Sequence, residues 1–211
     1  MRAETPAPMT ALQIADPLPV TVPRPMVLMR LGYRRPDQVP EKTGRLIDEI
    51  MEQGKALLRP RASYGLFDAA TPEPGVTILA TTLRALSRSL HERMAGCRRS
   101  VLFAATIGAE ADAWIHDVME KGEMTRGLLA DAYASSAAIA LGLEVETIAA
   151  RVLSVEGLSP TKRHAPGYGD WPLSDQSPLC RLAGSERIGI TVTDDFLMIP
   201  AKSISGVIGG R

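Results

Sequence analysis

The chain has 211 residues, of which 45% are hydrophobic, and its 24 basic residues balance 24 acidic ones to a formal net charge of zero. This length predicts one domain, or one domain with an extension, and the apolar content is ample for a sizeable core. The neutral balance excludes the strongly basic footprint of proteins that bind nucleic acids or anionic membranes.

The first 25 residues are rich in proline and poor in charge, with six of the sixteen prolines and only four charged side chains. This composition predicts an extended arm that is flexible alone or ordered on a partner. The arm lacks the long apolar core of a secretory signal, and the longest apolar run further on is interrupted by Asp131. We therefore expect a cytoplasmic protein without a membrane span, whose domain proper covers residues 26–211.

Apolar residues that recur every three or four positions predict amphipathic helices after a connector at residues 26–40. The first helix covers residues 41–58 and stops before Pro60. A second helix is predicted after the Pro/Gly break at residues 71–75. Its apolar face would consist of Leu79, Leu83, Leu86, Leu90 and Met94.

The middle of the chain is predicted to contain one strand and two helices. The apolar run at residues 100–108 predicts a buried strand, and residues 109–121 return to helical spacing. Residues 124–153 are rich in alanine and other small side chains, which suits a helix packed closely on several sides. Gly142 is a candidate interruption of that helix.

The last third of the chain is predicted to hold one short helix followed by strands. Residues 173–184 suit a short helix capped by Ser174. Three strand-like segments follow, at 187–193, 196–200 and 202–210, with a hairpin turn between the first two. Helices come first and strands cluster late, without regular β–α–β alternation. This order predicts an α+β fold, with helices packed around a mainly antiparallel sheet.

The sequence lacks the spacings that mark common catalytic and metal sites. It has no P-loop, dinucleotide-binding fingerprint, nucleophile elbow or His-Glu-x-x-His motif. His91, His116 and His164 are scattered, while Asp194 and Asp195 lie in a predicted turn, where aspartate serves the backbone. We therefore predict neither catalytic side chains nor a metal site.

The two cysteines, Cys97 and Cys180, are far apart and belong to no Cys-x-x-Cys or Cys/His cluster. This placement favours buried thiols in a reducing compartment over a disulfide or a metal site.

The stretch RHAPGYGDWPL, residues 163–173, places two aromatic side chains near an arginine in a chain that is only 4% aromatic. Pro166 and Gly167 predict a tight turn. The guanidinium of Arg163 suits a carboxylate or phosphate, and Tyr168 offers a face for stacking. From the residues alone, the loop is either a ligand cradle or a rigid structural turn.

This loop resembles the R-x-A-P-G-Y signature of the activation domain of cobalamin-dependent methionine synthase. A second motif of that family is similar to residues 189–209, and it is carried by Thr193, Met198, Pro200, Ser203, Ser205 and Gly206. Residues 27–34 and 101–112 resemble segments of free-standing, single-domain members. The resemblance covers residues 26–211 and implies an α+β fold like that of the activation domain.

The resemblance implies a function in reactivation. In that family, the activation domain binds S-adenosylmethionine (AdoMet) and docks on a cobalamin domain whose reactive Co(I) has been oxidised to inert Co(II). An external reductant, often a flavodoxin, supplies one electron, and methyl transfer from the sulfonium traps the Co(I). The cofactors carry the chemistry while the protein binds and orients them, so the chain needs no acid, base or nucleophile.

The resemblance also assigns the residues that bind AdoMet, which are Arg163, Ala165, Pro166, Gly167 and Tyr168. Arg163 would hold the carboxylate of the methionine part, and the other residues would line the adenosine side. Trp171 is expected to pack in the core or within the loop, and Ser203 and Ser205 are expected to be structural residues of the sheet that supports the loop.

One position departs from the family pattern. The family has an acidic residue in the long small-residue helix, where it can meet the cationic amino group of AdoMet. Ile139 falls at that place in this chain, and Asp131 and Glu144 lie several residues away. An ammonium group without a partner would bind weakly.

Two hypotheses follow from the resemblance. The first is a separate reactivation subunit that works in trans on a cobalamin-binding methionine synthase, or a related corrinoid methyltransferase, with a flavodoxin-type electron donor. The second is a non-catalytic subunit that binds a corrinoid protein and has a degenerate AdoMet site. Ile139 favours the second hypothesis, whereas the intact Arg163, Gly167 and Tyr168 favour the first. A methyltransferase acting directly on small molecules ranks last, because no substrate pocket is indicated.

Overall fold

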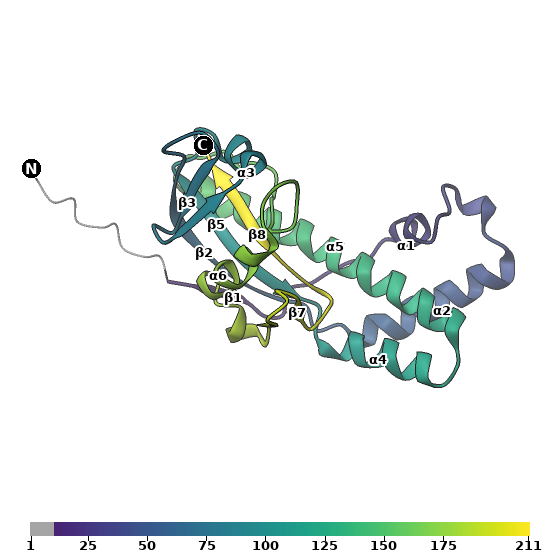
Figure 1. Cartoon of the computed structure of the whole chain (residues 1–211). Coiled ribbons are helices and arrows are strands. Elements are labelled where there is room, and N and C mark those ends of the chain that lie inside the picture. The colour runs from purple at the N-terminus through teal and green to yellow at the C-terminus, as the bar shows by residue number, and fades with distance from the viewer. Residues whose placement is uncertain (1–10) are drawn as a thin grey trace, which may run out of the picture.

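The computed structural model describes residues 11–211, so the first ten residues of the predicted arm lie outside it. An antiparallel sheet forms one end of the molecule, and helices α1, α2 and α4 form the other (Figure 1). The long helix α5 runs through both ends. The helices are α1 (Arg24–Arg30), α2 (Glu41–Leu57), α3 (Arg88–Met94), α4 (Ala109–Glu120), α5 (Met124–Val155) and α6 (Gln176–Leu182).

All strand pairs are antiparallel, as the sequence predicts. The larger sheet has the order β4-β3-β2-β5-β8, with β1 paired to β2, and β6 pairs with β7 in a separate ribbon. The strands are β1 (Gln13–Ala15), β2 (Arg61–Ala70), β3 (Val76–Leu79), β4 (Leu83–Leu86), β5 (Arg99–Thr106), β6 (Thr191–Val192), β7 (Met198–Ile199) and β8 (Ser203–Gly210). The prediction of an α+β fold with helices around an antiparallel sheet is therefore confirmed.

The central strand β5 divides the core into two halves, because successive side chains of a strand point to opposite faces. Val101 and Phe103 pack against α1, α2, α4 and α5 on one face. Leu102 and Ala104 pack on the other face with α3, α6 and the indole of Trp171. We call these the α5 face and the α3 face of the sheet.

The part of the predicted arm that the structure describes, residues 11–25, lies along the domain. Gln13 pairs with Tyr64 of β2 through the backbone, and its side-chain oxygen accepts a hydrogen bond from the Tyr64 hydroxyl at 2.8 Å. Leu18 is buried in the core of the α5 face. The predicted connector at 26–40 contains most of α1 and packs through Val27 and Leu28.

Several predicted elements are confirmed. Helix α2 ends three residues before Pro60 and buries Ile47 and Ile50 of its predicted apolar face. Helices α4 and α5 and strand β5 fall where the sequence places them, and Gly142 does not interrupt α5. Cys97 and Cys180 are buried free thiols, as predicted, and burial raises the pKa of Cys180 to about 11.

The helix predicted around Leu79–Met94 is wrong. Residues 76–86 form the hairpin of β3 and β4, whose turn has positive φ at Ala80 and Thr81, and only α3 follows. Leu79 and Leu83 are directly opposite each other across this hairpin. Their spacing of four therefore places both side chains on one face of a sheet as well as it would on a helix.

One strand was missed by the sequence analysis, and the predictions for the last third of the chain need correction. Strand β2 was not predicted, because its sequence RASYGLFDAA contains glycine and alanine in place of a regular β-branched alternation. Ser174 does not cap α6, since that helix starts at Gln176 after a 3-10 turn and has no side-chain cap. The strands predicted at 187–193 and 196–200 shrink to the two-residue strands β6 and β7, and the hairpin between them is confirmed.

The segment between α5 and the loop runs antiparallel to β8 and covers the free edge of that strand. Ser159 pairs with Arg211, the Thr161 amide donates to the Gly209 carbonyl at 2.8 Å, and His164 pairs with Val207 through bonds of 3.0 and 2.8 Å. We call residues 158–164 the edge segment. It leads directly into the loop 163–173.

Candidate functional site

The predicted loop forms a turn at the end of the edge segment. The Tyr168 amide donates to the Ala165 carbonyl at 3.1 Å, with Pro166 in the second position and Gly167 in the third at φ +86°. Proline followed by glycine with positive φ is the signature of a type II turn. The tight turn predicted from the sequence is therefore present.

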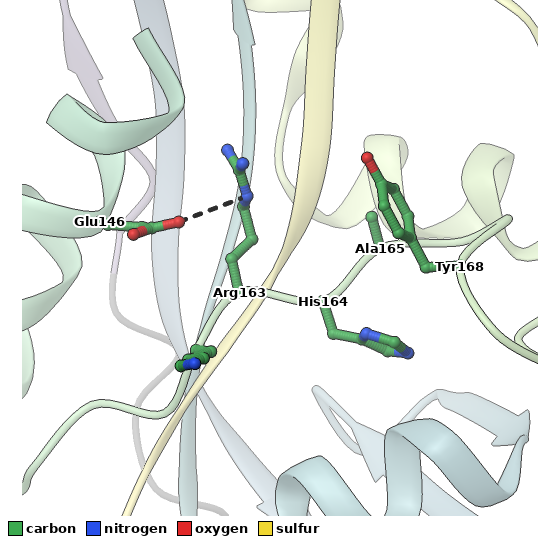
Figure 2. A pocket seen from close by; sticks show the side chains of 6 residues that line it. Glu146, Arg163, His164, Ala165 and Tyr168 are labelled. Atoms are coloured by element: carbon green, nitrogen blue, oxygen red, sulfur yellow. Dashed lines mark ion pairs between the residues drawn. The ribbon is translucent and has the colours of Figure 1, made fainter. Parts of the chain in front are cut away.

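Consecutive side chains of the loop point in opposite directions, as the pleat of a strand requires. In Figure 2, Arg163 points toward α5 and His164 points away from it. Arg163 thus belongs to the α5 face of the sheet, and His164 belongs to the α3 face.

Two neighbouring cavities share Arg163, Ala165 and Tyr168 in their walls. The larger, of about 340 Å³, is also lined by Glu146, Lys162 and His164. The smaller, of about 180 Å³, adds Pro166, Gln176, Met198, Ser203, Ile204 and Ser205. We call the two together the cradle. Its dimensions fall within the range of small-molecule sites.

The Arg163 guanidinium lies over the backbone of α5 at Gly142. A Cβ atom added at Gly142 would lie 1.9 Å from Nη1 of Arg163, so no larger residue leaves room for the guanidinium in this position. Nε of Arg163 is 3.5 Å from Oε1 of Glu146, one turn further along α5 (Figure 2). The buried Nη1 has no hydrogen-bond partner. A buried donor without a partner is costly. The Arg163 side chain that carries it lines both cavities.

The loop is fixed from the α3 face. His164 stacks on Trp171 with ring centroids 5.8 Å apart, and the indole nitrogen of Trp171 donates to Asp175 at 2.7 Å. Burial, followed by the charge of Arg93, lowers the pKa of His164. Trp171 is 1% exposed, whereas Tyr168 is 65% exposed. The two aromatic side chains therefore differ in role, and the expectation that Trp171 packs in the interior is confirmed.

The walls of the cradle contain four of the five predicted site residues. Arg163, Ala165, Pro166 and Tyr168 line one or both cavities, while Gly167 is outside both linings and shapes the turn. Ser203 and Ser205 have internal partners, as expected of supporting residues, and both also line the smaller cavity.

Sequence reasoning missed Glu146 and Gln176 in the walls of the cradle, and it missed the role of Gly142 beneath the Arg163 guanidinium. Glu146 lies seven residues after Ile139 on the same side of α5, so the helix carries a carboxylate two turns from the position predicted to lack one. Gln176 is 7% exposed and accepts a hydrogen bond from Ser205 at 3.1 Å. The spacing of Ile139, Gly142 and Glu146 on one helix face was the available signal.

The other polar residues considered from the sequence have separate partners. Asp131 pairs with Lys202 at 2.7 Å, so its carboxylate links α5 to the turn before β8.

Within residues 11–211, no group of three or more His, Cys, Asp or Glu side chains gathers in a manner suited to a metal ion. None of the helices in that part of the chain has the length and apolar character needed to cross a membrane.

In fold, the chain is similar to a solved MetH reactivation domain bound to AdoHcy. The TM-score is 0.71 at 17% sequence identity, and the match covers 97% of this chain and 79% of that one. The family model for the vitamin B12 dependent methionine synthase activation domain matches residues 85–211. The chain therefore belongs to the family of methionine synthase activation domains. No curated protein matches it in sequence.

Proposed function

We propose that the cradle binds AdoMet and that this chain reactivates, in trans, a cobalamin-dependent methionine synthase or a related corrinoid methyltransferase. The observation that carries the proposal is the Arg163 side chain, which lines both cavities beside Glu146 and has a nitrogen, Nη1, without a hydrogen-bond partner. A planar guanidinium with a free donor suits a carboxylate. The solved MetH reactivation domain, which this chain resembles in fold, is bound to AdoHcy.

AdoMet has a charged amino acid part and a nucleoside part. The cradle offers charged side chains to the first part, and backbone and an aromatic ring to the second. We assign the carboxylate of the methionine part to Arg163 and the ammonium group to Glu146. Glu146 already lies within ion-pair distance of Arg163, so it faces the place where the amino acid part would sit. The backbone of Ala165, the ring of Tyr168 and the smaller cavity would receive the nucleoside.

AdoMet would supply the methyl group to the Co(I) form of the partner's cobalamin, which the electron donor would produce by one-electron reduction of Co(II), and AdoHcy would be the leaving group. The chain itself would bind and orient, since its residues form no acid–base or nucleophilic pair in the cradle. We propose a flavodoxin-type protein as the electron donor and the reducing cytoplasm as the location.

The surface around the cradle suits docking of a protein partner. Tyr168 and Leu173 of the loop and Leu197 and Ile199 of the β6–β7 ribbon are large apolar side chains that are 39–65% exposed. Contiguous exposed apolar patches mark interaction surfaces. We propose that the exposed side chains of the loop, Tyr168 and Leu173, contact the corrinoid partner.

The alternative of a degenerate, non-catalytic subunit rested on Ile139. Ile139 is exposed on α5, but Glu146 provides a carboxylate beside Arg163 that Ile139 does not. No other observation favours the alternative, which becomes one outcome of the experiment below.

Calorimetry with S-adenosylhomocysteine (AdoHcy) and AdoMet tests the binding proposal. We expect saturable binding to the wild type and an affinity loss of about 10- to 150-fold for Arg163→Ala, because hydrogen bonds between charged groups contribute about 1.5–3 kcal/mol. Arg163→Lys should restore little, since an ammonium cannot donate as a planar fork. Glu146→Gln should weaken binding, whereas Glu144→Gln on the same helix is the matched control.

A second assay tests reactivation. The chain is mixed with a cob(II)alamin-loaded methionine synthase lacking its activation domain, a one-electron reductant and AdoMet, and methylcobalamin is followed by absorbance. We expect methylcobalamin with the wild type and its loss with Arg163→Ala. Binding to the partner without any AdoHcy binding or methylcobalamin would establish the non-catalytic alternative instead.

A further inference from the structure

Asp170, near the end of the loop, is attached to the first turn of α3 by four hydrogen bonds. Its carboxylate accepts from the hydroxyls of Ser87 and Ser89 at 2.7 and 2.6 Å, and from the amides of Arg88 and Ser89 at 2.8 and 3.0 Å. These bonds link residues more than eighty positions apart in sequence. Asp170 does not line the cradle.

The same cluster reaches the residue next to Arg163. The Ser89 hydroxyl, which donates to Asp170, is also 3.1 Å from Nε2 of His164. His164 in turn stacks on Trp171, directly after Asp170 in the chain. The two ends of the loop are therefore joined through Ser89 on the α3 face, while the loop's middle carries Ala165 and Tyr168 to the cradle on the other side.

The chemistry of the cluster explains why a carboxylate occupies this place. The two hydroxyls and two amides are all hydrogen-bond donors, and an ionised carboxylate can accept a hydrogen bond from each of them. The hydrogen bonds from Ser89, followed by those from Ser87 and Arg88, hold the pKa of Asp170 far below its usual range. Asparagine would keep one accepting oxygen and direct an NH2 group at a donor.

We infer that Asp170 is a positioning residue that latches the loop onto α3 and thereby keeps the cradle in its binding geometry. This inference rests on the proposed function for its ligand, since the cradle is taken to bind AdoMet. Without the latch, the loop keeps the His164–Trp171 stack, the hydrogen bond from Trp171 to Asp175 and its own backbone hydrogen bonds, but it loses its attachment to the first turn of α3. The loop then samples other geometries. The apparent dissociation constant for the ligand rises in inverse proportion to the fraction of time that the binding geometry is present.

The test compares AdoHcy affinity with loop protection in the same variants. For Asp170→Ala we expect a dissociation constant raised about tenfold, which corresponds to a loop that is competent about a tenth of the time. Asp170→Asn should fall between Asp170→Ala and the wild type. Hydrogen exchange should speed up at the amides of Gly167, Tyr168 and Trp171, which donate within the loop.

A matched variant separates positioning from general destabilisation. Val118→Ala removes buried methyl groups from α4, far from the loop, and should lower the thermal midpoint while leaving the affinity within about twofold of the wild type. Faster exchange in Asp170→Ala with unchanged affinity would overturn the inference, as would unchanged exchange.

Failure of the proposed function would be seen separately. If the wild type bound no AdoHcy, the AdoMet proposal would be contradicted, and the exchange rates would still decide whether Asp170 holds the loop. Loop amides that stayed as protected in Asp170→Ala as in the wild type would then overturn the latch as well.

Discussion

The two faces of the sheet contribute to the cradle in different ways. On the α5 face, Arg163 lies over Gly142 with one nitrogen unpartnered and only a long contact of 3.5 Å to Glu146. On the α3 face, His164 and Trp171 are stacked and hydrogen-bonded. Polar groups whose hydrogen bonds are satisfied help to make a loop rigid. We therefore propose that the cradle binds its ligand through Arg163 on the α5 face and is fixed from the α3 face.

The largest effect on stability is expected from Trp171→Ala, which tests the different roles of the two faces. Removing a fully buried indole should lower the free energy of unfolding by about 3–5 kcal/mol, measured by urea denaturation. Tyr168→Ala, only three residues earlier, should change it by less than about 0.5 kcal/mol because that side chain is mostly exposed. Similar losses in the two variants would contradict the division of roles.

Gly206→Ala should break the contact between β8 and the edge segment. A Cβ atom there would lie 2.6 Å from the backbone oxygen of His164, and backbone atoms cannot move aside cheaply. We expect a loss of about 1–3 kcal/mol in the free energy of unfolding, together with weaker AdoHcy binding. Gly75→Ala is not a suitable control because of its positive φ, so Thr125→Ala on the exposed start of α5 serves instead.

Gly142→Ala separates stability from recognition on the α5 face. Alanine favours a helix over glycine by about 1 kcal/mol, so the thermal midpoint should not fall. The new Cβ displaces the Arg163 guanidinium, and AdoHcy affinity should drop about tenfold or more, as for the loss of a charged hydrogen bond. Calorimetry and thermal unfolding of the same samples check both halves, and unchanged affinity would show that the guanidinium position is not needed.

The smallest effect concerns pH and the α3 face. Burial lowers the pKa of His164 in the folded protein below the ordinary value of 6.5, so the folded state binds this proton less readily than the unfolded state. Stability should therefore be full above about pH 6.5 and decrease as the pH falls toward the folded pKa. Unfolding measured at about pH 7.5 and about pH 5 should show a smaller difference in His164→Gln than in the wild type. An equal difference would place the titration elsewhere.

Local patterns in the sequence predicted much of the fold, and they failed where one spacing fits both a helix and a hairpin. Helix α2 carries its apolar residues at helical spacing and ends before Pro60, so residues close together in the sequence determine where it lies. The leucines at 79 and 83 satisfy the same spacing across a hairpin. The turn at Ala80 and Thr81 makes this segment a hairpin and not a helix, and its positive φ values are ones that non-glycine residues rarely adopt.

The site divides in the same way. Arg163, Ala165, Pro166 and Tyr168 are contiguous in one motif, so a single short stretch identifies them. Glu146, Gly142 and Gln176 reach the cradle only because α5 passes beneath the loop and α6 follows it. The spacing of Gly142 and Glu146 puts them on one face of α5, but only the three-dimensional arrangement shows that this face lies beneath the loop.

The edge segment has a consequence beyond ligand binding. Without residues 158–164, strand β8 would present a row of free amide and carbonyl groups, flanked by Val207 and Ile208, at the border of the sheet. Open borders of this kind pair with other chains and begin aggregates. A chain whose edge segment detached from β8 would therefore tend to pair with its own copies, so the segment that leads into the cradle also helps to keep the molecules apart.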